Sequence, residues 1–219
     1  MVREKLEIVN AFAGEYRGRI VCDTTPLAER YYAANSGSGF IGKNAMLIHP
    51  LHGSYFFLAF ILFEKKLPDL NVYPDLKKSD YIFTAEGKYD FAANLEKFCA
   101  SCDKCTKACP GDAIRNGLIN SQRCYSYWSI ENKLGFIQAK FKDINSVFGC
   151  DICQDVCPYN ARSFSAKLPD FKISEVSRKI IDGNLENLNL KGTSYERTGI
   201  TGLRRNLNFI NTAKEIRGT

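Results

Sequence analysis

The chain has 219 residues, 45% of them hydrophobic, and a formal net charge of +6, so it can bury a core in one or two domains. Its longest apolar run, residues 55–63, is too short to cross a bilayer. Nine cysteines and no visible signal peptide indicate the reducing cytoplasm and argue against a disulfide-bonded secreted protein.

The first part of the chain predicts a helix, a strand and a second helix. Residues 1–16 form an amphipathic pattern, and residues 19–22 are typical of a short strand. Thr25 and Pro26 resemble an N-cap and a first helical position, so we expect a helix from there to Ala34.

The next segment predicts strands followed by an irregular insertion. The Asn-Ser-Gly-Ser-Gly sequence at residues 35–39 ends the second helix. Residues 45–48 and 55–63 are interpreted as paired strands joined around Gly53. The charged stretch 65–97 is expected to be an insertion with a weak helix near its end.

Two cysteine runs make residues 99–160 the most informative part of the chain. The first has the spacing C-x2-C-x2-C-x3-C-P, and the second has C-x2-C-x3-C-P. They consist of Cys99, Cys102, Cys105, Cys109 and Pro110, and of Cys150, Cys153, Cys157 and Pro158. The first spacing is that of bacterial ferredoxins, in which the fourth cysteine ligates the other [4Fe–4S] cluster. The sequence therefore predicts two such clusters.

Two clusters need eight thiolates, and the two runs supply seven. The eighth is either Cys124, in a predicted helix at residues 121–132 between the runs, or Cys22, far upstream. We assign Cys124 and leave Cys22 as a small buried hydrophobe. The predicted ligand sets are Cys99, Cys102, Cys105 and Cys157 for the first cluster, and Cys109, Cys124, Cys150 and Cys153 for the second. Zinc is the alternative metal, but its sites are built from C-x2-C pairs without this rhythm.

The C-terminal part is helical and basic. From Ile173 onward we expect helices with turns at Gly183 and Gly192. Residues 162–219 hold eleven Lys and Arg against six Asp and Glu, a net charge of +5. Such a segment suits a polyanion such as RNA, although a solvated helical surface would look the same.

Three features outside the cysteines bear on possible chemistry. Residues 37–43 read G-x4-G-K, but Asn44 replaces the Ser or Thr of a phosphate loop, and the segment is expected to join a helix to a strand. His49 and His52 lack further ligands for a metal. Asp23, between a strand and a helix, is either a solvated turn carboxylate or a general acid whose pKa is raised in an apolar pocket.

Several of these segments resemble the epoxyqueuosine reductase family. The matching stretches are residues 23–30, 39–44, 53–58, 124–131 and 149–160, with a weaker echo at Arg197-Thr198-Gly199 and Arg204-Arg205-Asn206. The cluster motifs are shared by many ferredoxin-like proteins, whereas the segments at residues 23–30 and 39–44 make the resemblance specific.

The resemblance implies an oxidoreductase that uses cobalamin and two [4Fe–4S] clusters to reduce epoxyqueuosine to queuosine in tRNA, the last step of queuosine biosynthesis. It implies Asp23 as the proton donor and cobalamin contacts at Asp23, Leu47, Leu58, Cys150 and Asp151. The implied partners are a tRNA with a queuosine-type wobble base and a low-potential electron donor, with no membrane.

The sequence also departs from the family, because family members carry roughly a hundred residues before the Asp23 segment. We therefore expect an N-terminally shortened gene product, one half of a split enzyme whose second chain supplies the missing part, or a ferredoxin-like electron-transfer protein or subunit that binds no cobalamin. A corrinoid reductase with another substrate is a further alternative. The expected fold class is α+β: a partial corrinoid-binding α/β core at residues 1–97, a two-[4Fe–4S] ferredoxin-like domain at 98–163 and a helical basic segment at 164–219.

Overall fold

The computed structural model describes residues 2–12, 14, 17–22, 25–66, 80–162 and 173–218. It divides into two compact units, the first made of residues 1–102 and 158–164, the second of residues 103–157 and 165–219. The domain boundaries expected after residues 97 and 163 stay a prediction; the first compact unit includes Cys99 and Cys102. Asp23 and residues 67–79 of the expected insertion lie outside the described residues.

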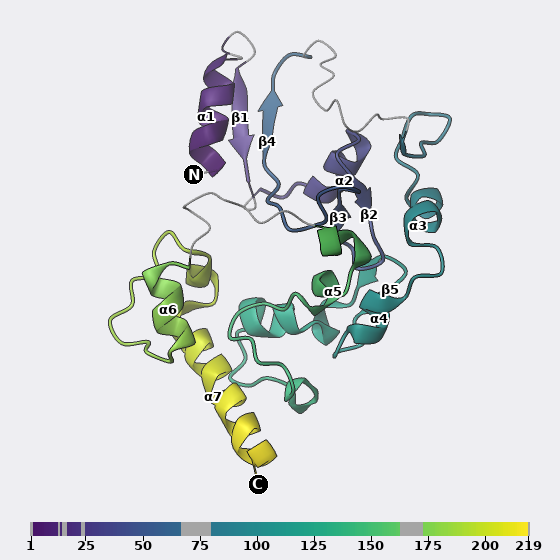
Figure 1. Ribbon diagram of the computed structural model, residues 1–219. Helices are drawn as coiled ribbons and strands as arrows, with labels where there is room; N and C mark the ends of the chain where they lie inside the picture. The colour runs from purple at the N-terminus through teal and green to yellow at the C-terminus, as the bar shows by residue number, and fades with distance from the viewer. Residues whose placement is uncertain are drawn as a thin grey trace. The chain divides into compact units, whose positions relative to one another are not determined.

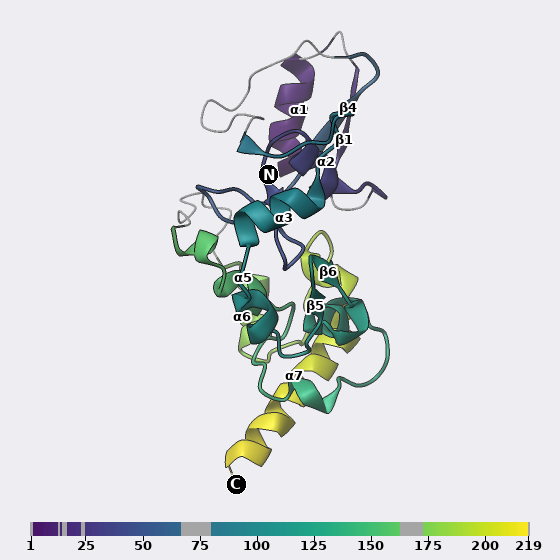
Figure 2. The ribbon, with the colours of Figure 1, turned by 90° about the vertical axis from the view of Figure 1, so that its right-hand side faces the viewer.

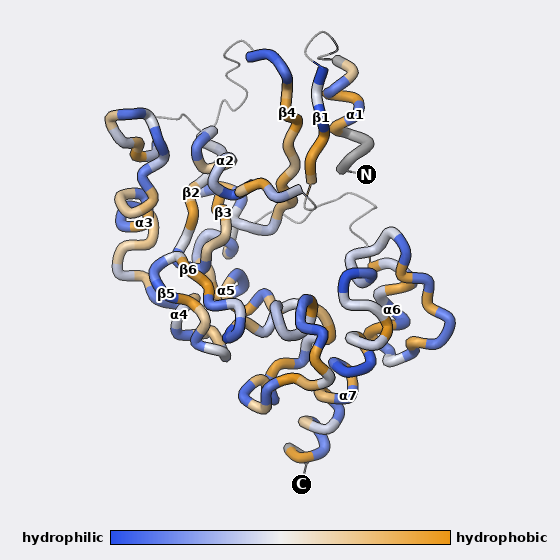
Figure 3. Tube along the Cα trace, turned by 180° about the vertical axis from the view of Figure 1, so that it is seen from behind, coloured by the Kyte–Doolittle hydropathy of each residue, from blue (hydrophilic) through white to orange (hydrophobic). Residues whose placement is uncertain are grey.

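The first unit combines helices with two small antiparallel sheets (Figure 1). In chain order its elements are α1 (Val2–Phe12), β1 (Gly18–Val21), α2 (Glu29–Asn35), β2 (Phe40–Ile41), β3 (Leu47–Ile48), β4 (Phe60–Phe63), α3 (Phe91–Cys99) and the 3-10 helix η6 (Pro158–Arg162). The strands β1 and β4 pair antiparallel, and α1 lies beside them. The hydrophobic sequence of β4 stands out in orange in Figure 3.

The predicted strands exist, but their predicted pairing is wrong. The strand β3 pairs with β2, and β4 pairs with β1. A tight turn explains the first pairing, because Gly42 donates to the Met46 carbonyl and Ala45 to the Gly42 carbonyl, 3.0 and 2.9 Å away. Gly53 closes only an isolated bridge with His49. A uniformly apolar strand such as β4 does not specify its partner.

The start of one helix and the exposure of the apolar face of another also differ from expectation. The helix α2 begins at Glu29, so the start predicted at Thr25 is wrong. The Thr25 carbonyl accepts a hydrogen bond from Leu27, two residues on, which closes a narrower turn than a helix does. The helix α1 is confirmed in type, but its apolar residues Ile8 and Val9 are 63% and 54% exposed.

Aromatic stacking joins distant parts of the first unit. The fully buried Phe40 ring stacks on Phe98 of α3 with centroids 4.3 Å apart, and Tyr159 meets it edge-on at 5.1 Å. The Tyr159 hydroxyl also donates to the Phe98 carbonyl. Residues after the last cluster cysteine are thereby fixed to the helix that ends at Cys99.

Gly53 allows its backbone to lie close to the side chain of Asn160 in η6. Gly53 has a φ of +74°, and a Cβ there would collide with the Asn160 side-chain oxygen. That oxygen accepts a hydrogen bond from the Ser54 amide at 2.7 Å, and the Asn160 amide group donates to the Ser54 hydroxyl at 2.9 Å. The residue at position 53 must therefore have no Cβ and must adopt a left-handed backbone conformation.

The second unit contains most of the predicted cluster module and the C-terminal helices (Figure 2). Its elements are α4 (Lys104–Ala108), β5 (Ile114–Arg115), β6 (Leu118–Ile119), the 3-10 helix η3 (Ser121–Arg123), the π-helix η4 (Tyr127–Glu131), η5 (Ala139–Phe141), α5 (Ile152–Asp155), α6 (Glu175–Ile181), η8 (Ser194–Arg197) and α7 (Gly199–Gly218). One apolar cluster forms around Tyr125, Trp128 and Phe141, and another joins Ile180 to Leu203.

The helical character predicted for the C-terminal segment is confirmed. The turns expected at Gly183 and Gly192 have φ of +76°, and α6, η8 and α7 lie around them in the chain. The weak helix expected near residue 97 is also confirmed as α3. Within the described ranges, no helix is long and apolar enough to cross a membrane.

The contact at Gly53 yields a stability prediction. Gly53→Ala should destabilise the protein by about 2–4 kcal/mol, because it adds a steric collision to the cost of a left-handed alanine. Gly87→Ala is the matched control, since Gly87 has nearly the same φ of +75° but nothing lies within 4 Å of the position that its Cβ would take. It should cost only about 1 kcal/mol. Anaerobic urea unfolding measures both, and equal losses would contradict the role of Asn160.

Candidate metal centre

Four of the six half-buried cysteines in the second unit form the set predicted for the second cluster. They are Cys109, Cys124, Cys150 and Cys153. Cys109 follows α4, Cys124 follows η3, and the other two flank the start of α5. The helices α4 and α5 contact each other, which brings the end of the first cysteine run to the start of the second.

The thiols of this group influence one another electrostatically. Burial raises the pKa of Cys153 to about 12, and charges on Cys150, Cys105, Cys124 and Cys109 contribute to the rise. Burial also raises the pKa of Cys150, with Cys124 and Cys109 again contributing. Converging, desolvated sulfurs favour the thiolate state only when a cation neutralises them, and soft iron centres supply that charge.

Backbone amides also point at these sulfurs. The Ala113 amide donates to the Cys109 sulfur at 3.3 Å. A backbone hydrogen bond from Ile152 acts on Cys150 and opposes the rise of its pKa. Such bonds stabilise thiolates and tune the potential of a bound cluster. Within the described residues, no three His, Cys, Asp or Glu side chains lie close enough together to hold a single metal ion, so the ligand set stays a prediction.

The helix predicted to carry Cys124 is interrupted at that residue. The 3-10 helix η3 ends before it, Cys124 itself is extended (φ −91°, ψ 126°), and a π-helix follows at η4. The helical character predicted for residues 121–132 is therefore confirmed on both sides of Cys124, with a break in conformation at that residue. The Cys124 amide still donates to the Ser121 carbonyl, and its carbonyl accepts from Trp128. The π-helix that follows is of a kind that is frequent at functional sites.

The other predicted set is divided between the units. Cys99 and Cys102 lie at the end of α3 in the first unit, and Cys105 and Cys157 belong to the second. Burial raises the pKa of Cys99, whereas a backbone hydrogen bond and the charge of Lys43 lower it. These four residues stay a predicted ligand set.

Lys43 holds the loop that carries Cys102. Its ammonium donates to the Ala100 carbonyl at 2.6 Å and to the Cys102 carbonyl at 2.9 Å. Ala100 lies in a strained conformation with a φ of +35°, which the ammonium helps to fix. In the sequence, Lys43 belongs to an incomplete phosphate-loop pattern and to the segment 39–44 that resembles the family, and neither predicted these contacts. The order predicted for that segment, helix before strand, is confirmed.

The remaining predicted site residues lie as follows. Asp23 falls outside the described residues. Cys22 is half-buried and directs its thiol to the Leu58 carbonyl at 3.6 Å, so the buried hydrophobe that we expected is only partly buried. Of the predicted cobalamin contacts, Leu47 is only 3% exposed, whereas Leu58 is half-buried and Asp151 is exposed. Cobalamin binding stays a prediction.

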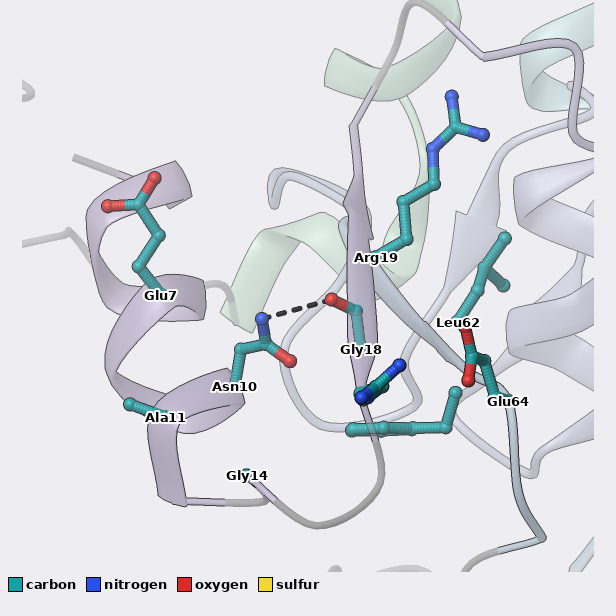
Figure 4. Close-up of a pocket in the computed structure, with 10 residues that line it drawn as sticks. Glu7, Asn10, Ala11, Gly14, Gly18, Arg19, Leu62 and Glu64 are labelled. Carbon is teal, nitrogen blue, oxygen red and sulfur yellow. Dashed lines mark hydrogen bonds between the residues drawn. The ribbon is translucent and has the colours of Figure 1, made fainter.

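Two further features of the first unit, a histidine pair and a pocket, contain none of the residues predicted as ligands or as the proton donor. The His49 and His52 rings stack at 4.3 Å, and His49 Nδ1 accepts hydrogen bonds from the amides of Leu51 and His52. A pocket between α1, β1 and β4 is shown in Figure 4, where Asn10 donates to the Gly18 carbonyl. None of the ten residues lining it is a predicted ligand.

Comparison with known proteins identifies the cysteine segment and extends the match to most of the chain. Residues 98–160 match the family model of the 4Fe-4S double cluster binding domain. An epoxyqueuosine reductase of Cyclobacterium marinum is 34% identical over 215 residues, covering 95% of this chain and 63% of the relative.

Two solved structures share the fold. An epoxyqueuosine reductase with an epoxyqueuosine-modified tRNA-Tyr stem loop is 26% identical with a TM-score of 0.69, covering 97% of this chain and 54% of that one. The Bacillus subtilis epoxyqueuosine reductase, with an aspartate-bearing catalytic loop swung out of its active site, is 26% identical with a TM-score of 0.67 and the same coverage. The chain thus spans just over half of these solved proteins.

The choice of the eighth ligand can be tested by counting iron. An anaerobically reconstituted Cys124→Ala variant should hold about four irons instead of about eight, because one [4Fe–4S] cluster loses a thiolate. Cys22→Ala is the matched control and should keep the full complement. Iron analysis per chain decides, and a loss of iron from the Cys22 variant alone would reverse the assignment.

The Lys43 contacts predict an effect on the other set of cysteines. Lys43→Met should weaken iron retention by the first cluster by about 1–3 kcal/mol, because two carbonyls near Cys102 lose a charged donor. Lys88→Met, the same change at an exposed lysine, should have no effect. Iron release to a chelator, followed anaerobically, measures both, and equal release rates would exclude this role for Lys43.

Proposed function

We propose that the chain belongs to the epoxyqueuosine reductase family and takes part in reducing epoxyqueuosine to queuosine in tRNA, with two [4Fe–4S] clusters. The observation that carries the proposal is the gathering of cysteines from both runs in a chain whose match to an epoxyqueuosine reductase covers 95% of its length. The chain spans 63% of that relative, so the assay described below includes a polypeptide that covers the rest.

The reaction removes an epoxide oxygen and leaves an alkene. Two electrons and two protons enter, both carbon–oxygen bonds break, and the oxygen leaves as water. Clusters of this type deliver electrons one at a time, and a bound cobalamin would supply the low-potential cobalt centre that accepts them. The chain's own residues would hold the clusters, shield them from water and donate a proton.

Asp23 is the residue that we propose as the proton donor. An aspartate-bearing catalytic loop in the solved Bacillus subtilis enzyme supports this assignment. A carboxyl group in an apolar site holds its proton near neutral pH, so it can protonate the oxygen as the ring opens. Loss of that group would block turnover without touching any cluster ligand.

A tRNA partner is supported by a relative and by charge. One solved epoxyqueuosine reductase holds a modified tRNA stem loop. In this chain Lys191, Arg204 and Lys214 are exposed within a segment of net charge +5, which suits a phosphate backbone. An RNA substrate and thiolate-bound iron would both suit the reducing cytoplasm, where a low-potential donor would supply the electrons.

One alternative is a cluster-bearing electron-transfer subunit that binds no cobalamin, because the family model that matches residues 98–160 describes only a 4Fe-4S double cluster binding domain. Both candidates predict the same iron content. They differ in corrinoid uptake, because a visible cobalamin absorption band that co-purifies with the chain would exclude the subunit.

The proposal is tested with the reconstituted protein, epoxyqueuosine-containing tRNA, cobalamin and a low-potential reductant under anaerobic conditions. The chain is assayed alone and with a polypeptide covering the part of a relative that it does not span. Queuosine formation in either mixture supports the proposal. Its absence from both, with clusters present, would overturn the catalytic role.

Asp23→Asn gives the residue-level prediction. The variant should keep about eight irons and lose about 10²- to 10⁴-fold in turnover, because an amide cannot donate the catalytic proton. Asp182→Asn, the same change at an exposed position, should leave turnover unchanged. Queuosine formation and iron content are measured together, and near-normal turnover of the Asp23 variant would exclude it as the donor.

A further inference from the structure

The C-terminal helix reaches into both loops that carry ligands of the second cluster. We infer that Arg205 and Asn206 of α7 are positioning residues for this cluster, because they hold the loops of Cys124 and Cys150 at a fixed spacing. The inference rests on the proposed ligand set. It assigns a role to the Arg-Arg-Asn sequence at residues 204–206, which sequence reasoning noted only as a weak echo.

Asn206 joins the two loops directly. Its side chain is fully buried, and its amide nitrogen donates to the Ser129 carbonyl at 2.8 Å and to the Val147 carbonyl at 2.7 Å. Ser129 lies in η4, five residues after Cys124, and Val147 lies three residues before Cys150. One amide group therefore spans the two ligand-bearing segments.

Arg205 fixes the orientation of that amide. Its Nε and one terminal nitrogen donate to the Asn206 side-chain oxygen at 3.0 and 2.8 Å. The oxygen is thereby occupied as an acceptor, and the amide nitrogen must face the loop carbonyls. The same guanidinium donates to the carbonyls of Trp128, Asn132 and Leu134 at 2.8, 2.6 and 2.9 Å.

These donors serve backbone carbonyls of the π-helix η4 that would otherwise lack hydrogen-bond partners. The last carbonyls of any helix lack partners within it, and a buried carbonyl without a donor costs about 1–3 kcal/mol. Here Arg205 and Asn206 serve Trp128 and Ser129, and the Thr198 hydroxyl serves the Ile130 carbonyl at 2.9 Å. The helix α7 thus stabilises the element that follows Cys124.

Further hydrogen bonds connect the π-helix to the residues around Cys150. The Ser129 hydroxyl donates to the Tyr125 carbonyl and accepts from the Gly149 amide, both at 3.0 Å. The Ser126 hydroxyl donates to the Cys150 carbonyl at 3.4 Å. Displacing Ser129 would therefore displace the residues next to both ligands.

The test removes the amide nitrogen of Asn206 as a donor and keeps its side-chain oxygen as an acceptor. Asn206→Asp preserves an oxygen for Arg205 but turns a second oxygen toward the two carbonyls. Anaerobic reconstitution should then give about four irons per chain instead of about eight. Asn208→Asp is the matched control, the same change at an exposed position of the same helix, and should keep about eight.

A double-mutant cycle separates positioning from general destabilisation. In a Cys124→Ala background, which lacks the second cluster, Asn206→Asp should remove no further iron. In a Cys102→Ala background it should reduce the iron from about four to near zero. Full iron content of Asn206→Asp, or further loss in the Cys124→Ala background, would overturn the inference.

A milder variant serves if Asn206→Asp does not fold, as judged by far-ultraviolet circular dichroism. Arg205→Lys keeps the charge but loses the planar fork. It should release the irons of one cluster to a chelator several-fold faster than the wild type, with an altered electron paramagnetic resonance signal from that cluster alone. Wild-type release and signal would overturn the inference. The proposed reductase activity is judged separately, by queuosine formation in the wild type.

Discussion

Burial of several thiols at one place is the constraint on which the second unit depends. Burial raises the pKa of Cys153, and charges on Cys150, Cys105, Cys124 and Cys109 contribute to the rise. Without a cation such thiols are stable only in the neutral state. If iron binds them as predicted, its binding free energy would also stabilise the fold.

The chain meets this constraint by using segments that are distant in sequence. In the predicted ligand set, one ligand comes from the first cysteine run, one from the stretch between the runs and two from the second run, so no single loop would supply the cluster alone. Hydrogen bonds from α7 hold the intervening π-helix and the loop before Cys150. Electron transfer needs fixed distances between redox centres. Loops that are held to a helix by hydrogen bonds keep such distances better than loops without these contacts.

The sequence allowed the metal chemistry to be predicted more fully than the fold. Cysteine spacing reflects the geometry of a cluster and can be read locally, as can the turns at Gly183 and Gly192. Strand pairing was predicted wrongly, because the apolar sequence of β4 carries no information about its partner β1. The roles of Lys43, Arg205 and Asn206 depend on carbonyls distant in sequence, which no local pattern reveals. A polar asparagine among the apolar residues of a basic helix was the only available signal.

The central claim is that the two cysteine runs exchange a ligand, so that Cys109 and Cys153 serve the same cluster. Iron content of the double variant Cys109→Ala/Cys153→Ala tests this most directly. The account predicts about four irons per chain, because both substitutions remove ligands of one [4Fe–4S] cluster. Iron near zero, with the chain still folded, would mean that each run builds its own cluster and would contradict the account.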